Sequence, residues 1–169
     1  IPADITAPSV RIIESGPVRT VVEAVFGWHH SFICQRYKLP ARGTAVEVET
    51  RVHWNEKSRM LKLLLPMKRA GNSVQAQSAY IRQELPTDGG EGVMQQWVLV
   101  RDADHGTALS VLNGGTYGCD YSDRGLRLSL LRSAAYAGHP IKKKYPEMPE
   151  DRYLPRIDQG ERRFNFVLD

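Results

Sequence analysis

The sequence lacks a long apolar run. Its longest uninterrupted apolar stretch is residues 63–67, which contains Pro66 and falls far short of the roughly 20 residues of a membrane span. The chain does not open with a positively charged segment followed by an apolar core, so no signal peptide is visible. Together these two absences predict a protein without a membrane partner.

Cysteine is scarce as well. The two cysteines, Cys34 and Cys119, lie 85 positions apart and form no C-x-x-C pair. Such isolated cysteines are typical of free, buried thiols in a reducing compartment, so we expect a cytoplasmic protein. Whether the two thiols pair is a question for the structure.

The sequence has no marked excess of charge of one sign. It holds 23 basic and 19 acidic residues, and its only compact basic run, residues 142–144, lies in a proline-rich stretch. A nucleic-acid-binding protein clusters its basic residues on one face and interleaves them with aromatic residues. Here the arginines are spread along the whole chain, so we expect no nucleic-acid partner.

The motifs of a catalytic centre are also missing. His29 and His30 are adjacent, and on an extended chain adjacent side chains point to opposite faces, so the pair is poorly placed to chelate one ion. There is no G-x-S-x-G elbow and no phosphate-binding loop. The acidic residues of the turn regions are expected to bond backbone amides: Asp88, Glu91, Asp102, Asp104, Asp120 and Asp123. We therefore assign no catalytic residue and no metal ligand to this chain.

Apolar and polar residues alternate with a period of two. In residues 45–54, Val46, Val48, Val52 and Trp54 share one face of an extended chain and charged residues occupy most of the other. The same analysis predicts strands at residues 18–28, 31–39, 60–65, 78–85, 94–101, 107–112, 126–130 and 164–168. Glycine- and proline-rich turns separate these runs, and only residues 130–137 suggest a turn or two of helix. The pattern predicts an all-β, antiparallel β-sandwich of about nine to twelve strands. A long loop at residues 138–158 carries four prolines.

Residues 113–120 depart from the alternation. They hold three glycines together with Asn113, Tyr117 and Asp120. An amide, a carboxylate and an aromatic ring on one loop can recognise sugar hydroxyls by hydrogen bonding and stacking. The alternative interpretation is a wide hairpin whose glycines take positive φ.

Several segments together resemble one family. Residues 46–66 resemble the "V-x-W-x-E-x-x-x-L-L-K-x-x-x-P" segment of glycoside hydrolase family 38 α-mannosidases. Residues 113–120 and 126–133 resemble its "L-N-x-x-x-Y-G-Y-D … L-x-L-T-L-L-R-S" signature, although Cys119 stands where the family often has Tyr. Residues 158–160 and 164–168 resemble its final strand, with Glu161 and Arg162 where the family often has a His.

The resemblance implies that residues 1–169 form one mutarotase-like supersandwich domain, a C-terminal fragment of a larger glycosidase. The whole enzyme would release terminal α-linked mannose with retention. The zinc and the catalytic carboxylates would belong to a missing N-terminal barrel, and no cofactor to this fragment. The expected partners are that barrel, a helical middle domain and mannosides, with Asn113, Tyr117 and Asp120 as substrate-proximal candidates. We expect an exposed apolar interface beside residues 113–120 and 138–158.

Two other functions stay open. A free-standing carbohydrate-binding module would expose aromatic residues along a groove, whereas Trp28, Trp54 and Trp97 fit the buried phases of strands. A sugar epimerase on the same fold would need a His acid facing a carboxylate base. Only His105, close to Asp102 and Asp104, approaches that arrangement.

Overall fold

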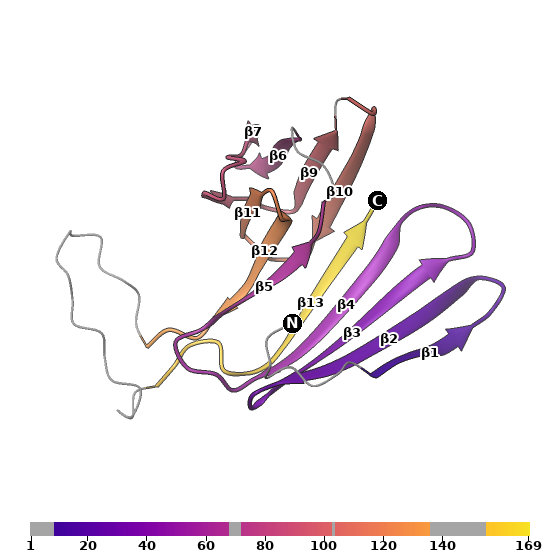
Figure 1. Ribbon diagram of the computed structural model, residues 1–169, viewed down its shortest axis with the longest axis vertical. Helices are drawn as coiled ribbons and strands as arrows, with labels where there is room; N and C mark the ends of the chain where they lie inside the picture. Colours follow the sequence, from indigo (N-terminus) through magenta and orange to yellow (C-terminus); the bar gives the residue numbers. More distant parts are fainter. Residues whose placement is uncertain (1–8, 68–71, 103, 136–154) are drawn as a thin grey trace.

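The computed structural model describes residues 9–67, 72–102, 104–135 and 155–169. These residues form thirteen β-strands, all antiparallel to their neighbours, and no helix (Figure 1). None of them therefore belongs to a helix long and apolar enough to cross a membrane. The expected all-β antiparallel sandwich is confirmed, with one strand more than the upper end of the predicted range.

The strands follow in chain order as β1 (Ser9–Ser15), β2 (Arg19–Trp28), β3 (Ser31–Pro40), β4 (Val46–Trp54), β5 (Met60–Leu65), β6 (Ser73–Ser78), β7 (Ile81–Glu84), β8 (Glu91–Val93), β9 (Trp97–Asp102), β10 (Thr107–Asn113), β11 (Gly118–Ser122), β12 (Gly125–Arg132) and β13 (Gly160–Leu168).

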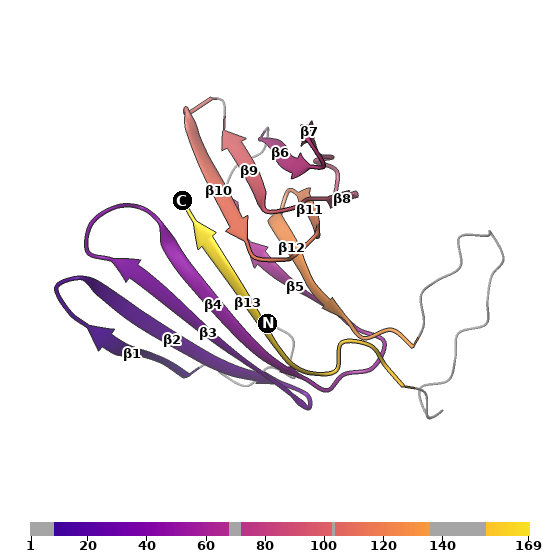
Figure 2. The same cartoon turned by 180° about the vertical axis from the view of Figure 1, so that it is seen from behind.

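The strands form two sheets of unequal size. The large sheet has nine strands in the order β1-β2-β3-β4-β13-β10-β9-β6-β7, and the small sheet has four in the order β5-β12-β11-β8. Figures 1 and 2 show the small sheet beside the β13–β7 part of the large sheet, with β1 to β4 spreading to the other side. We call the side of the large sheet that faces the small sheet its inner face.

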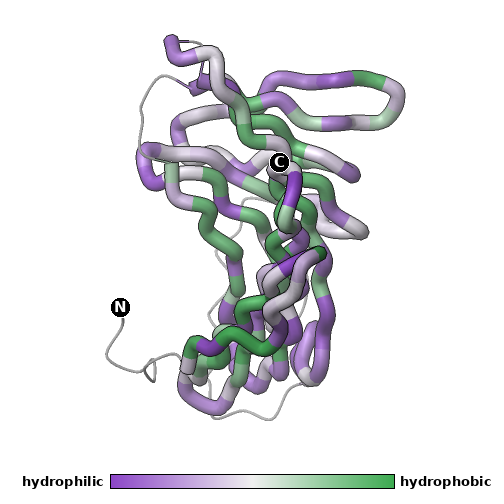
Figure 3. Tube along the Cα trace, turned by 90° about the vertical axis from the view of Figure 1, so that its right-hand side faces the viewer, coloured by the Kyte–Doolittle hydropathy of each residue, from purple (hydrophilic) through white to green (hydrophobic). Residues whose placement is uncertain are grey.

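The core lies between the two sheets and follows from the alternation. On β4, Val48, Val52 and Trp54 point inward and are at most 2% exposed, while Glu47 and Arg51 point outward. Cys119, Leu126 and Leu128 of the small sheet pack in one cluster with Val48, and Leu131 packs in a second cluster with Val52 and Trp54. Figure 3 shows the resulting alternation of hydrophobic and hydrophilic residues along the strands.

Strand β2 departs from its predicted pattern. Its expected apolar face, which carries Val22 and Ala24, is only half-buried, whereas Glu23 on the other face is 4% exposed. The Glu23 carboxylate accepts hydrogen bonds from Arg11 Nη2 at 2.7 Å and from Arg36 Nε at 2.9 Å. These bonds from Arg11 and Arg36 lower the pKa of Glu23. Arginine side chains can cover a neighbouring group with their apolar stems, so a charged position becomes buried.

Two predicted elements are corrected. The strand expected at residues 78–85 is shorter: β7 begins at Ile81 after a turn in which Tyr80 has φ 64°, and residue 78 ends β6, a strand that the alternation did not predict. The helix suggested at residues 130–137 is wrong for its first three residues, because β12 continues to Arg132 and pairs with β5. Polar residues inside β6 and leucines at the end of β12 blur the period on which those predictions rest. Most of the loop predicted at residues 138–158 lies outside the described residues.

A buried corner ties the two sheets together. Trp54 ends β4 of the large sheet, and its Nε1 donates to Ser133 Oγ at 3.1 Å, just beyond β12 of the small sheet. The same hydroxyl accepts from Arg59 N at 3.2 Å and donates to Arg59 O at 3.1 Å. Trp54 also stacks on Trp28 with ring centroids 5.5 Å apart. The crossing from β4 to β5 is thus fixed by a hydroxyl with three hydrogen-bonding contacts.

Glu56 fixes the neighbouring hairpin. Its Oε1 accepts from Ser31 Oγ at 2.7 Å and from His30 N at 3.0 Å, at the turn where His29 has φ 49°. Ser31 Oγ in turn accepts from Asn55 N at 2.9 Å. The tryptophan and glutamate of the 46–66 segment therefore stabilise the fold at one corner.

We expect Ser133→Ala to lower the free energy of unfolding by about 1–3 kcal/mol, because Trp54 Nε1 and Arg59 N lose a buried acceptor. Ser129→Ala is the matched control, since Ser129 Oγ is buried without a hydrogen-bond partner among the described residues. It should change the stability by less than about 0.5 kcal/mol or raise it. Urea unfolding of both variants measures the difference, and equal losses would contradict the role of Ser133.

Candidate functional site

The loop between β10 and β11 is shorter than predicted. Asn113 is the last residue of β10 and Gly118 the first of β11, so the loop is residues 114–117. Within it, Gly115 has φ 147°, a backbone conformation that favours glycine. We call residues 114–117 the 114–117 loop.

Asn113 holds this loop in shape. Its Oδ1 accepts from Gly115 N at 2.9 Å and from Thr116 N at 2.6 Å, and its Nδ2 donates to Gln95 O at 2.8 Å. The residue is 9% exposed. Both polar groups of the Asn113 side chain are therefore hydrogen-bonded to backbone atoms, which agrees with the interpretation of residues 113–120 as a hairpin.

Tyr117 is the exposed aromatic residue of the loop. It is 65% exposed, while its backbone oxygen accepts from Met94 N at 2.9 Å. The backbone is fixed on both sides, by Asn113 and by Met94, but the ring faces solvent. This arrangement presents an aromatic ring and a phenol on a shaped loop.

Asp120 lies inside β11, on the face of the small sheet that points away from the core. Its carboxylate is fully buried and accepts from Arg127 Nε at 2.5 Å and from Lys62 Nζ, which also contacts Glu91. Burial of the Lys62 amine acts to lower its pKa, but the hydrogen bonds and charges of Asp120 and Glu91 outweigh this, and the pKa is raised. Asp120 is thus the centre of an ion-pair cluster, and the structure separates it from the loop that holds Asn113 and Tyr117.

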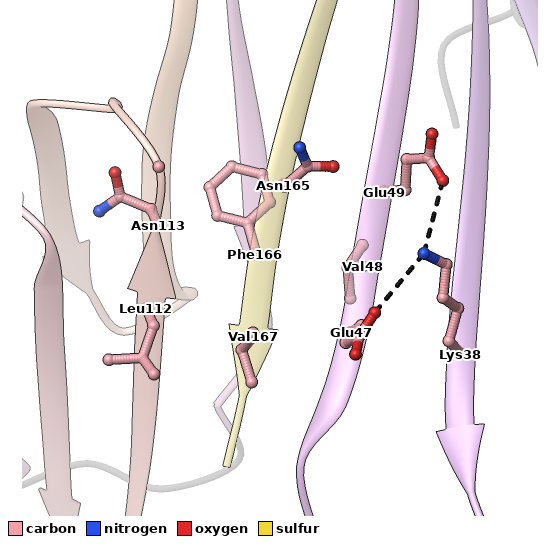
Figure 4. A pocket seen from close by; sticks show the side chains of 10 residues that line it. Lys38, Glu47, Val48, Glu49, Leu112, Asn113, Asn165, Phe166 and Val167 are labelled. Carbon is pink, nitrogen blue, oxygen red and sulfur yellow. Dashed lines mark hydrogen bonds and ion pairs between the residues drawn. The ribbon is translucent and has the colours of Figure 1, made fainter. Parts of the chain in front are cut away.

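An open groove of about 500 Å³ crosses the outer face of the large sheet. Lys38 lies in it between Glu47, at 3.5 Å, and Glu49, at 3.8 Å, with Leu112 and Asn165 on the neighbouring strands (Figure 4). Its one aromatic residue, Phe166, is 2% exposed. The groove offers carboxylates and an amide but no exposed ring. Sequence reasoning missed it because its residues come from the outward positions of four strands far apart in the chain.

His105 forms a turn with Asp102. The Asp102 carboxylate accepts from His105 N at 3.2 Å, and His105 Nδ1 lies 3.0 Å from Asp102 Oδ1. A carboxylate that bonds the backbone amide three residues later is typical of a turn. Among the described residues, no three His, Cys, Asp or Glu side chains are grouped as metal ligands are.

Both cysteines are free thiols, as predicted, on different sheets. Cys119 is buried in the core, and burial raises the pKa of its thiol to about 11. Cys34 is only half-buried, on the outer face of the large sheet, and burial raises its pKa too. Neither has the lowered pKa of a reactive cysteine.

Comparisons with known proteins agree with one another. The profile of the family described as "Glycosyl hydrolases family 38 C-terminal domain" matches residues 1–147. Alpha-mannosidase G of Dictyostelium discoideum is 27% identical over 182 residues, a match that covers 99% of this chain and 15% of that protein. A crystal structure of a glycosyl hydrolase family 38 protein from Enterococcus faecalis is similar with a TM-score of 0.74 and 16% identity, over 99% of this chain and 23% of that one. An α-mannosidase from E. faecalis V583 is similar with a TM-score of 0.72 and 14% identity, over 99% of this chain and 22% of that one.

We expect Asn113→Ala to lower the free energy of unfolding by about 2–3 kcal/mol, because it removes three hydrogen bonds and leaves the buried Thr116 amide without an acceptor. Tyr117→Phe should change it by less than about 0.5 kcal/mol, because that side chain is exposed. Urea unfolding of the two variants checks this. Equal stabilities would show that Asn113 does not hold the loop.

Proposed function

The chain belongs to the glycosyl hydrolase family 38 C-terminal domain family, and from this premise we propose that it is a non-catalytic domain of a larger α-mannosidase. The observation that carries the proposal is the family match over residues 1–147. Because the chain spans only 15–23% of the length of these relatives, each of them has room for a separate catalytic domain. We call the full polypeptide the parent.

The reaction assigned to the parent is hydrolysis of terminal α-linked mannose with retention, which uses two carboxylates about 5 Å apart. Zinc, which the family resemblance implies, does not fit the described residues, since they bring together no set of three ligand side chains. Asp120, the one carboxylate among the three candidates, is buried and already neutralised by Lys62 and Arg127. We therefore assign the zinc and the catalytic carboxylates to the rest of the parent.

Within the parent, this domain packs on the catalytic barrel and presents the 114–117 loop to the mannoside. Tyr117 is the contact residue, because its ring and phenol are exposed on a loop of fixed shape. Asn113 is a positioning residue, because its amide bonds only backbone groups. Asp120 is also a positioning residue. Its carboxylate pairs with Lys62 and Arg127 and holds these two side chains on the outer face of the small sheet. The two free thiols favour a reducing compartment and so a cytoplasmic parent.

The groove with Glu47, Glu49 and Asn165 favours a second candidate, a free-standing carbohydrate-binding module. Its polar side chains can bond hydroxyl groups, but the tryptophans contribute no platform to it: Trp54 is 1% exposed, and Trp28 and Trp97 are half-buried. The pairing of His105 with its own turn gives no support to an epimerase.

The isolated chain should release no nitrophenol from nitrophenyl α-mannoside, with or without added zinc, whereas the parent should. The reason is that the described residues hold a sandwich core and no grouping of catalytic carboxylates with a metal site. Calorimetric titration with mannose distinguishes the second candidate, which requires binding by the isolated chain. Zinc-dependent turnover by the isolated chain would overturn the non-catalytic assignment.

In the parent, Tyr117→Phe should lower kcat/KM by the equivalent of about 1–3 kcal/mol, because a hydrogen bond made to the transition state is lost. The melting temperature should not change. Tyr80→Phe is the matched control, since Tyr80 is an exposed tyrosine in the turn between β6 and β7. If both variants keep full activity, Tyr117 does not contact the substrate.

A further inference from the structure

The inner face of β1, and of the parts of β2 and β3 beside it, is largely apolar, and no described strand covers it. The strand register places Val10, Ile12 and Leu39 on this face, beside Val22 and Ala24 of β2. Val10 is 61% exposed, Ile12 65% and Leu39 40%. A run of exposed apolar residues over three adjacent strands is typical of an interaction surface.

The outer face of the same strands carries a network of charged pairs. Glu23 lies between Arg11 and Arg36 in a cross-strand ion-pair ladder, and Lys38 pairs with Glu47 and Glu49 on the next strand. Charged pairs of this kind suit a face that meets water. Apart from the exposed Phe32, the outer face is therefore suited to water, whereas the inner face carries several exposed apolar residues on adjacent strands.

The small sheet stops at the border of this bare face. Leu61 of β5 and Leu131 of β12 pack on Ile33 and Val52, and half-buried Phe26 joins the same cluster. Strand β5 is one of the two edges of the small sheet and, among the described strands, pairs only with β12. Its free backbone edge is the one nearer to β1, β2 and β3, as Figures 1 and 2 show. An unpaired strand edge beside an uncovered apolar face is a template for further strands.

We propose that strands from another part of the parent extend the small sheet from β5 and cover the inner face of β1, β2 and β3. Since neighbouring strands are about 4.8 Å apart, about three further strands span the three bare ones. The occupant belongs to the same polypeptide because the new layer continues a sandwich interface already present, and because the relatives are several times longer than this chain. This assignment rests on the proposed function, in which the chain is part of a larger protein.

The surface differs from the one expected beside residues 113–120. Near that loop Leu112 and Val93 are exposed, but Leu112 belongs to the outer face of the large sheet and Val93 to the small sheet. They do not form one face. Among the described residues, the contiguous apolar surface is the one on β1, β2 and β3, while residues 138–154 of the expected interface lie outside them.

Cysteine labelling of the parent tests the proposal. Ile12→Cys, with Val10→Cys as a second variant, places a thiol on the inner face, and Phe32→Cys places one on the outer face, where Phe32 is 62% exposed. Maleimide labelling is followed by mass spectrometry of the peptides, so that Cys34 and Cys119, with their raised pKa values, are read separately. We expect the inner thiols to react at least about tenfold more slowly than the Phe32→Cys thiol. Equal rates at all three positions would overturn the proposal.

A photo-crosslinker attached at the Ile12→Cys thiol identifies the occupant. The expected product is a cross-link within one molecule, to a peptide outside residues 1–169, and the amides of β5 should be protected from hydrogen exchange in the parent. A cross-link between two molecules would show a second copy on this face and would contradict the assignment. None of these readouts depends on mannosidase activity, so failure of the proposed function and failure of this inference can be told apart.

Discussion

The hydrogen bond from Trp54 to Ser133 determines how the two sheets meet. It joins the last residue of β4 to the residue that follows β12, and Arg59, which leads into β5, shares the same hydroxyl. Because buried polar groups are costly when unpaired, the indole and the hydroxyl select one position of the small sheet over the large one. The stacking of Trp28 on Trp54 extends this constraint to β2. The common core and the placement of the 114–117 loop both follow from that alignment.

Where one face of a strand is buried and the other is exposed to solvent, the sequence predicts the structure well. Strand β4 is the clearest case, since every inward residue from Val48 to Trp54 is buried as the alternation requires. Strand β2 fails the same test because Glu23 is covered by two arginines that lie on other strands, which no local pattern records. The prediction near Tyr80 fails for a different reason: β6 and β7 are so polar that the alternation shows neither β6 nor the turn between the two strands.

The sequence predicts which segment holds the candidate site, but it does not predict the different roles of the three candidate residues in it. Asn113, Tyr117 and Asp120 lie within eight residues, and composition alone treats them as equivalent. The structure distinguishes them by burial and by partner: an amide bonded to backbone, an exposed ring, and a carboxylate enclosed by Lys62 and Arg127. The change from loop to strand at Gly118 causes the separation, because in a strand each successive side chain changes face.

The unequal size of the two sheets explains why β1 carries the exposed apolar residues Val10 and Ile12 on its inner face. A strand that met water on both faces would gain nothing from Val10 and Ile12, and the charged ladder through Arg11 and Glu23 shows that β1 and β2 do carry polar residues where water is the neighbour. Layers of secondary structure are stable when their apolar faces are buried against another layer. The small sheet covers β3 and β2 only at one end, where Leu61 and Leu131 pack in one cluster with Ile33 and Phe26. The apolar face beyond that point is therefore best understood as one half of a sandwich whose other half lies elsewhere in the parent.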